Sequence, residues 1–313
     1  MNAVAGDFFY QSTDGLKLYC AIHPAQRANV ATTDDCGAAG GAGRGLPVLC
    51  LPGLTRNSRD FHALAAHLSQ QHEVLAVDLR GRGRSAWDSD SNHYELSTYV
   101  RDSWTLLDAR GIDRFVAIGT SLGGLIAMTM SAMQPRRVAG VVLNDIGPEI
   151  DPAGLRRIAG YVGRLPAVSN WSEATAQTKS VYAHALPGLS DEQWLHYARC
   201  GYHENDSGIP VTDFDPRIAE VFNRSAKSGS DLWSVFQRLM TVPMLVIRGG
   251  MSDILSLETV KRMIRDKANL THLTIPERGH APLLDEPECL RAIDEFLMRH
   301  GCGSSLPQIP SCA

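Results

Sequence analysis

The sequence predicts an α/β protein whose sheet is mostly parallel, covered by helices on both faces and interrupted by an inserted block of helices. Short apolar runs of strand length alternate with amphipathic segments of helix length, first up to Leu143 and again from Met244. These runs are continuously apolar, which is typical of parallel strands buried on both faces. Between the two regions the sequence shows helical spacing and no convincing strand.

The expected strands begin with a hairpin, in which residues 8–11 and 16–23 alternate in polarity around a Ser-Thr-Asp-Gly turn. The apolar runs that follow predict buried strands at residues 48–51, 74–77, 115–118, 138–143, 244–248 and 270–275. Helical spacing predicts core helices at residues 59–71, 97–110, 122–133, 257–264 and 287–299.

The inserted block defines the expected domain organisation. Residues 1–147 and 241–300 form the core domain, and residues 148–240 form a helical lid. Amphipathic spacing in the lid predicts helices at residues 153–165, 172–184, 191–202, 216–225 and 231–240. Residues 25–46 are rich in Ala, Gly, Thr and Asp and have no periodicity, so we interpret them as a flexible loop. The tail at residues 301–313 carries Gly, Ser and Pro, and we expect it to be disordered.

Composition narrows the class of protein. The 313 residues carry a formal net charge of −4, and the short cluster of Arg80, Arg82 and Arg84 is too small to predict a nucleic-acid partner. No apolar run approaches the roughly 20 residues that span a bilayer, and the N-terminus lacks the features of a secretory signal. The seven cysteines are scattered and form no C-x-x-C pair. We therefore expect a cytoplasmic protein that acts on a small molecule, without a nucleic-acid or membrane partner. A homodimer is a possible assembly.

The candidate nucleophile is Ser121, which lies in Gly119-Thr120-Ser121-Leu122-Gly123, a match to the pattern G-x-S-x-G. The pentapeptide directly follows one expected strand and directly precedes an expected helix. A turn this tight strains the serine backbone and requires small neighbours. It would raise the hydroxyl to the carboxyl edge of the sheet, where the helix N-terminus favours developing negative charge. A phosphate site is the alternative for such a turn, but no Walker-type G-x-x-x-x-G-K-[ST] run and no Lys accompany it.

A serine hydroxyl needs a base to become a nucleophile, and the candidate base is His280. It lies in Glu277-Arg278-Gly279-His280, just past the last expected strand, on the same sheet edge as Ser121. The acid that orients the imidazole should follow another strand end. We favour Asp253, beyond the strand at 244–248, because the strand before the final one usually supplies the acid in the order Ser, Asp, His. Asp145, directly beyond the strand at 138–143, is the alternative acid.

The tetrahedral intermediate of acyl transfer needs hydrogen-bond donors for its oxyanion. By position we assign the backbone N–H of Leu122, the residue after the nucleophile, as one donor. The second is the N–H of Leu54, in the loop Leu51-Pro52-Gly53-Leu54 that follows the strand at 48–51.

These elements together resemble the α/β-hydrolase fold superfamily, in its branch of lidded esterases, lactonases and C–C hydrolases. The matching motifs are the Pro52-Gly53 loop, Asp78-Leu79-Arg80-Gly81-Arg82-Gly83-Arg84-Ser85, the turn at Ser121, Ser252-Asp253 and Gly279-His280-Ala281-Pro282. The resemblance implies an eight-stranded, mostly parallel sheet and a hydrolase that uses neither a cofactor nor a metal. One departure is Pro52, which stands where members of the superfamily often carry a His.

The expected activity is therefore hydrolysis of a carboxylic ester or lactone of a small, largely apolar substrate, through an acyl-enzyme on Ser121. Hydrolysis of a C–C bond in a meta-cleavage-type diketone would use the same three side chains and is an alternative. A ligand receptor built on a hydrolase scaffold is a third hypothesis from a different class. The lid aromatics Tyr161, Trp171, Tyr182, Trp194, Tyr197 and Trp233 either line the substrate pocket or pack the lid helices together.

Overall fold

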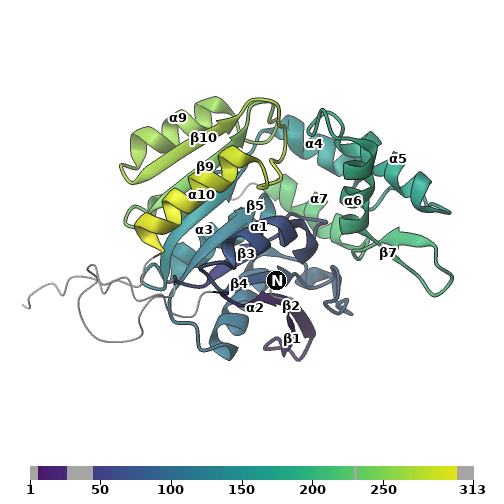
Figure 1. Ribbon diagram of the computed structural model, residues 1–313, viewed down its shortest axis with the longest axis horizontal. Coiled ribbons are helices and arrows are strands. Elements are labelled where there is room, and N and C mark those ends of the chain that lie inside the picture. Colours follow the sequence, from purple (N-terminus) through teal and green to yellow (C-terminus); the bar gives the residue numbers. More distant parts are fainter. Residues whose placement is uncertain (1–5, 27–44, 229–230, 302–313) are drawn as a thin grey trace, which may run out of the picture.

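The computed structural model describes residues 6–26, 45–228 and 231–301 (Figure 1). The predicted flexible loop and C-terminal tail thus lie almost wholly outside the described residues. Eight strands form one sheet in the order β1-β2-β4-β3-β5-β6-β9-β10. Their bounds are β1 Gly6–Gln11, β2 Lys17–His23, β3 Val48–Leu51, β4 Val74–Asp78, β5 Phe115–Thr120, β6 Val138–Asn144, β9 Met244–Gly249 and β10 Leu270–Ile275.

The strands from β4 to β10 pair in parallel, and β2 pairs in antiparallel fashion with both of its neighbours, β1 and β4. The predicted mostly parallel eight-stranded sheet is thereby confirmed. Central strands are buried on both faces, as their continuous apolar runs predicted; all four residues of β3 are buried. Parallel pairing brings the carboxyl ends of β3, β5, β6, β9 and β10 to one edge of the sheet, which is where the candidate side chains were expected.

Helices cover both faces of the sheet, as predicted. On one face, Leu49 and Leu51 of β3 pack in a core with residues of α2 (Leu96–Ala109), α3 (Leu122–Met133) and α9 (Leu257–Asp266). On the other face, Val48 and Cys50 pack in a core with residues of α1 (His62–Leu68) and α10 (Pro287–His300). The alternation of neighbouring β3 residues between these two cores is the two-residue period of a strand.

The described residues between β6 and β9 contain five helices and a short hairpin. Three of the helices lie with the hairpin to one side of the sheet (Figure 1), whereas the last one packs against α3. The helices are α4 Pro152–Tyr161, α5 Trp171–Tyr182, α6 Asp191–Gly201, α7 Ile218–Ser228 and α8 Leu232–Gln237. The hairpin, β7 Tyr202–Glu204 with β8 Pro210–Thr212, was not predicted. Each strand has only three residues, too few to show an alternating pattern. Among the described residues, every helix is too short or too polar to cross a membrane.

Candidate active site

The side chains singled out in the sequence meet at the carboxyl edge of the sheet. Ser121 follows β5, Asp145 directly follows β6, and His280 lies in the loop after β10. Because β5 and β6 are hydrogen-bonded neighbours, Ser121 and Asp145 stand at the ends of adjacent strands. The amide of Ser121 donates to the carbonyl of Asn144 at 3.1 Å, which extends the pairing of the two strands up to the site.

The turn at Ser121 has the strained backbone that its sequence predicted. Ser121 has φ 53° and ψ −116°, in the left-handed half of φ that L-residues rarely adopt. The turn closes so tightly that a Cβ on Gly119 would lie 2.3 Å from the carbonyl oxygen of Gly123. A Cβ on Gly123 would lie 2.0 Å from the carbonyl oxygen of Leu51. Glycine at these two positions therefore allows the helix α3 to start immediately after the serine.

Replacement by alanine should have different effects on stability at two glycines of this site, Gly123 and Gly53. In Gly123→Ala the new methyl group would overlap the backbone of β3, which cannot move aside, so we expect unfolding to become easier by about 1–3 kcal/mol or more. In Gly53→Ala the nearest atoms, Arg56 Cγ at 3.6 Å and Ser121 Cβ at 3.9 Å, leave ordinary contact room. That variant should keep its thermal stability and lose ester turnover, since its methyl group stands beside the nucleophile. Thermal unfolding and turnover measured on both variants check this contrast; equal stability of the two would contradict it.

A continuous chain of hydrogen bonds joins Ser121, His280 and Asp145. Ser121 Oγ lies 2.9 Å from His280 Nε2, and His280 Nδ1 lies 2.8 Å from Asp145 Oδ2. Asp145 is fully buried. Its carboxylate also accepts hydrogen bonds from the amide of Gly249 at 2.8 Å and from Ser252 Oγ at 2.6 Å. These donors fix the carboxylate so that one oxygen faces the imidazole.

Asp253, the acid that we favoured from the sequence, does not contact His280. Its carboxylate instead pairs with Arg157 of α4 through Nε at 2.5 Å and Nη2 at 2.8 Å. The hydrogen bonds from Arg157 hold the pKa of Asp253 below its usual value. The loop after β9 carries Asp253 away toward the segment between β6 and β9, whereas Asp145 directly follows a strand adjacent to that of Ser121. The structure therefore corrects the preference and places the alternative, Asp145, against the imidazole.

Sequence reasoning missed two supporting residues. Ser252, read as part of a Ser-Asp motif, donates to Asp145. Asn144, the last residue of β6, donates through its side-chain amide to Thr120 Oγ1 at 3.0 Å and to the carbonyl of Pro282 at 2.9 Å. It thus ties the loop that carries His280 to the strand end beside Ser121. A buried Asn that ends an otherwise apolar strand is the sequence feature that could have indicated this role.

The amides of Leu54 and Leu122, which we assigned to the oxyanion, donate no hydrogen bond within the described part of the chain. Leu122 is the first residue of α3, where a helix leaves its amides free. Gly53 lies close to Ser121, since a Cβ on Gly53 would be 3.9 Å from Ser121 Cβ. Both amides thus belong to segments next to the serine.

A cavity of about 380 Å³ opens over Ser121 and His280. Gly53 and Leu54 of the loop after β3 line it, and so do Tyr161, Tyr182 and Tyr197 from the segment between β6 and β9. Trp194 instead packs in a small core of its own. Trp171 donates to Glu204, and Trp233 lies against Arg262. Of the aromatic residues singled out between β6 and β9, the three tyrosines thus line the cavity, whereas the three tryptophans contact other parts of the protein.

Charged and polar side chains form part of the cavity wall. Arg56, 9% exposed, bonds Asp60 through Nε at 2.7 Å and lies over the ring of Tyr197 at 4.1 Å. Glu192 and His196 of α6 also line the cavity. The wall thus offers charged and polar groups as well as aromatic rings.

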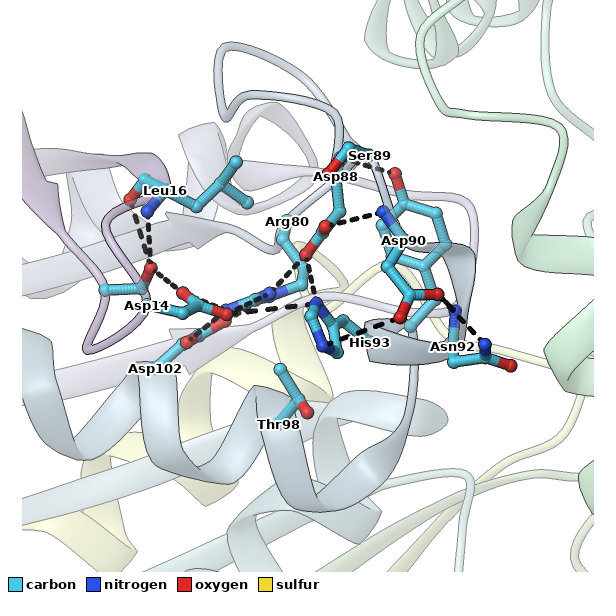
Figure 2. Close-up of polar contacts among 12 residues, drawn as sticks. Asp14, Leu16, Arg80, Asp88, Ser89, Asp90, Asn92, His93, Thr98 and Asp102 are labelled. Carbon is cyan, nitrogen blue, oxygen red and sulfur yellow. Dashed lines mark hydrogen bonds and ion pairs between the residues drawn. The ribbon is translucent and has the colours of Figure 1, made fainter.

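A second polar cluster surrounds Arg80, in the loop after β4 (Figure 2). Asp14, Asp88 and His93 are close enough to share a metal ion. However, the guanidinium of Arg80 bonds both Asp14 and Asp88, and through Nε and Nη2 it also bonds Asp102. A protein cation thus already satisfies these carboxylates, and the cluster serves to anchor Arg80.

Comparison with known proteins agrees with this fold. The family described as the alpha/beta hydrolase fold matches residues 47–287. The chain therefore belongs to the α/β-hydrolases and is a hydrolase, as the resemblance implied.

Two relatives and one solved structure are similar to the chain over most of its length. The chain is 32% identical over 257 residues to a 3-hydroxybutyrate-oligomer hydrolase of Cupriavidus necator, covering 80% of this chain and 87% of that protein. It is 28% identical to a 2-(acetamidomethylene)succinate hydrolase of Mesorhizobium japonicum, covering 82% and 89%. A crystal structure of an α/β-hydrolase from Novosphingobium aromaticivorans superimposes with a TM-score of 0.85 at 41% identity, covering 95% and 99%.

Proposed function

We propose that this hydrolase cleaves carboxylic esters through an acyl-enzyme on Ser121, with His280 as the base and Asp145 as the acid that orients it. The observation that carries the proposal is the unbroken chain from Ser121 Oγ through both imidazole nitrogens to the buried carboxylate of Asp145. Cys200 also lines the cavity, but burial raises its pKa to about 11, so it is a neutral thiol near pH 7 and a poor competing nucleophile.

In the first step His280 Nε2 takes the proton of Ser121 as the oxygen attacks the ester carbonyl carbon. Asp145, bonded to Nδ1–H, stabilises the imidazolium and keeps the tautomer whose Nε2 is free to accept. The negative charge that develops on the carbonyl oxygen is bound by the free amides of Leu54 and Leu122. Collapse of this intermediate breaks the ester bond, and His280 returns its proton to the leaving alkoxide.

In the second step water attacks the acyl-enzyme. His280 removes a proton from the water, the same two amides bind the second oxyanion, and the carboxylic acid leaves as Ser121 regains its proton. Ser121, His280 and Leu54 line the cavity, whereas Asp145 is buried against the imidazole and Leu122 directly follows the serine.

Short oligoesters of a hydroxy acid are the substrate class to test first. A relative that aligns over 80% of this chain is named for 3-hydroxybutyrate oligomers. Such a substrate offers an ester bond to Ser121 together with a terminal hydroxyl and a terminal carboxylate. The mixed wall of Arg56, Tyr182, Tyr197 and His196 supports polar ends of this kind, in place of the largely apolar substrate expected from the sequence.

The test is hydrolysis of a small p-nitrophenyl ester and of the 3-hydroxybutyrate dimer by the purified protein. We expect sustained turnover of both, and covalent labelling by a fluorophosphonate that peptide mapping assigns to Ser121. A single slow turnover without recycling would instead fit a ligand receptor. Turnover of a vinylogous diketone but of neither ester would favour C–C hydrolysis. Labelling of a residue other than Ser121 would contradict the proposed nucleophile.

A further inference from the structure

Arg82, in the loop after β4, takes no part in the proposed mechanism. It does contact the loop Leu51-Pro52-Gly53-Leu54, called the oxyanion loop below because Leu54 is a proposed oxyanion donor. The side chain of Arg82 is fully buried, and it forms no ion pair with a carboxylate among the described residues. Its Nε donates to the carbonyl oxygen of Leu54 at 2.9 Å. We propose that Arg82 is a positioning residue, which holds the Leu54 amide in place to bind the oxyanion. This inference rests on the proposed function.

The direction of the Leu54 N–H depends on the two peptide units that flank the Leu54 Cα. The unit that contains this N–H also contains the carbonyl of Gly53, which accepts from the amide of Arg56 at 3.2 Å. In a trans peptide the C=O and N–H point in opposite directions, so holding the Gly53 oxygen on one side directs the Leu54 N–H to the other. The following unit is held through the Leu54 oxygen by Arg82. With both units fixed, the N–H of Leu54 has little freedom to turn.

Arg82 itself is fixed by groups that do not belong to the oxyanion loop. Its Nη1 donates to the carbonyl of Arg80 and to the hydroxyl of Tyr99 of α2, both at 2.7 Å. The guanidinium carbon lies 4.8 Å from the Tyr99 ring centre and 5.8 Å from that of Tyr94. These contacts come from a core helix and from the loop itself, so the position of Nε is set independently of Leu54.

The loop that carries Arg82 is anchored on two sides. On one side, Arg80 bonds Asp14, Asp88 and Asp102, which Figure 2 shows around its guanidinium. On the other side, Arg82 forms an antiparallel bridge with Phe214 from the segment between β6 and β9. Arg82 thus connects these two anchors of its loop to the carbonyl of Leu54.

The choice of arginine at this position has a physical reason. A buried cation without a carboxylate partner is expensive to desolvate. Here neutral carbonyl and hydroxyl oxygens accept from Nε and Nη1, while Nη2 is buried without a hydrogen-bond partner among the described residues. The planar guanidinium reaches Leu54 through Nε while Nη1 bonds Tyr99 and Arg80, a spread that the single ammonium of lysine does not reproduce. The alignment of Leu54 accounts for a buried arginine at this position.

The experiment compares Arg82→Met and Arg82→Lys with the wild type in kcat, KM and inhibitor binding, after titration of active sites with a fluorophosphonate. A misplaced oxyanion donor should lower kcat about 10- to 100-fold in both variants, while KM changes less than about threefold. A trifluoromethyl ketone, which forms an oxyanion on adding to the serine, should lose affinity by the same factor as kcat. The matching alcohol, which forms no oxyanion, should bind as it does to the wild type.

Arg84→Met is the matched control, because Arg84 lies in the same loop and pairs with Asp7 at the surface; it should retain wild-type kcat. Arg82→Lys covers the case in which Arg82→Met does not fold. A purely structural role would reduce the titrated fraction but leave kcat per active site within twofold of wild type, and would overturn the proposal. Equal weakening of ketone and alcohol would also overturn it. If the wild type neither turns over esters nor binds the ketone, the proposed function fails and the role of Arg82 fails with it.

Discussion

Replacing Ser121 by alanine should lower the turnover of an activated ester by about 10⁴- to 10⁶-fold while leaving the protein folded. The reason is that no other group at the cavity floor can form the acyl-enzyme. Within the described ranges of the chain, the one side chain bonded to the serine oxygen is that of His280, through Nε2. Removing the serine oxygen leaves the imidazole bonded to Asp145 and the free amides of Leu54 and Leu122 unchanged. Steady-state kinetics with a p-nitrophenyl ester, together with circular dichroism, would measure both halves of this expectation.

A matched control for this variant is Ser131→Ala, a serine-to-alanine change on the helix that begins at Leu122. Ser131 is buried, and its hydroxyl donates only to the carbonyl of Ala127 at 2.7 Å, within the helix. That variant should keep wild-type turnover and fluorophosphonate labelling, whereas Ser121→Ala should lose both. Ester turnover by Ser121→Ala within tenfold of the wild-type rate would contradict the assignment of the nucleophile.

The sheet and the positions of Ser121 and His280 were accessible from the sequence because their signals are local. A continuously apolar run predicts a buried strand, and the glycine-flanked serine between such a run and a helix predicts the turn. The structure places Ser121 at φ 53° with glycines packed against backbone atoms, which is the steric situation the pentapeptide predicted. His280 was identifiable because it closely follows the last strand, and strand ends share one edge in a parallel sheet.

The acid was harder to identify, because two aspartates follow neighbouring strands and the sequence does not show where each carboxylate turns. Asp145 needed donors from Gly249 and Ser252, about a hundred positions further along the chain. The carboxylate of Asp253 instead pairs with Arg157, from a helix almost a hundred positions earlier in the chain. Contacts of Arg82 with Leu54 and Tyr99 are equally non-local. Side-chain direction after a strand is decided by such tertiary partners, which periodicity does not encode.

Replacing the two aspartates separately by asparagine should therefore give strongly unequal losses. In Asp145→Asn we expect kcat to fall about 10⁴-fold, because an amide oriented with its NH₂ toward Nδ1 stabilises the wrong imidazole tautomer and provides no charge for the imidazolium. The buried amide of Gly249 would still find its oxygen acceptor, and the hydroxyl of Ser252, which then faces the NH₂ group, can rotate to accept from it, so the protein should remain folded. Activity, rather than stability, is where this change should be measured.

In Asp253→Asn the imidazole keeps its carboxylate, so kcat should stay within a few-fold of the wild type. What is lost is the pair with Arg157, whose side chains are 24% and 32% exposed for Arg157 and Asp253, so the change in unfolding free energy should not exceed about 1 kcal/mol. Kinetics and thermal unfolding of the two isosteric variants, side by side, separate the roles. The opposite ranking in kcat would return Asp253 to the position of orienting acid. It would also mean that the loop after β9 rearranges during turnover, releasing Arg157 so that the carboxylate can reach His280.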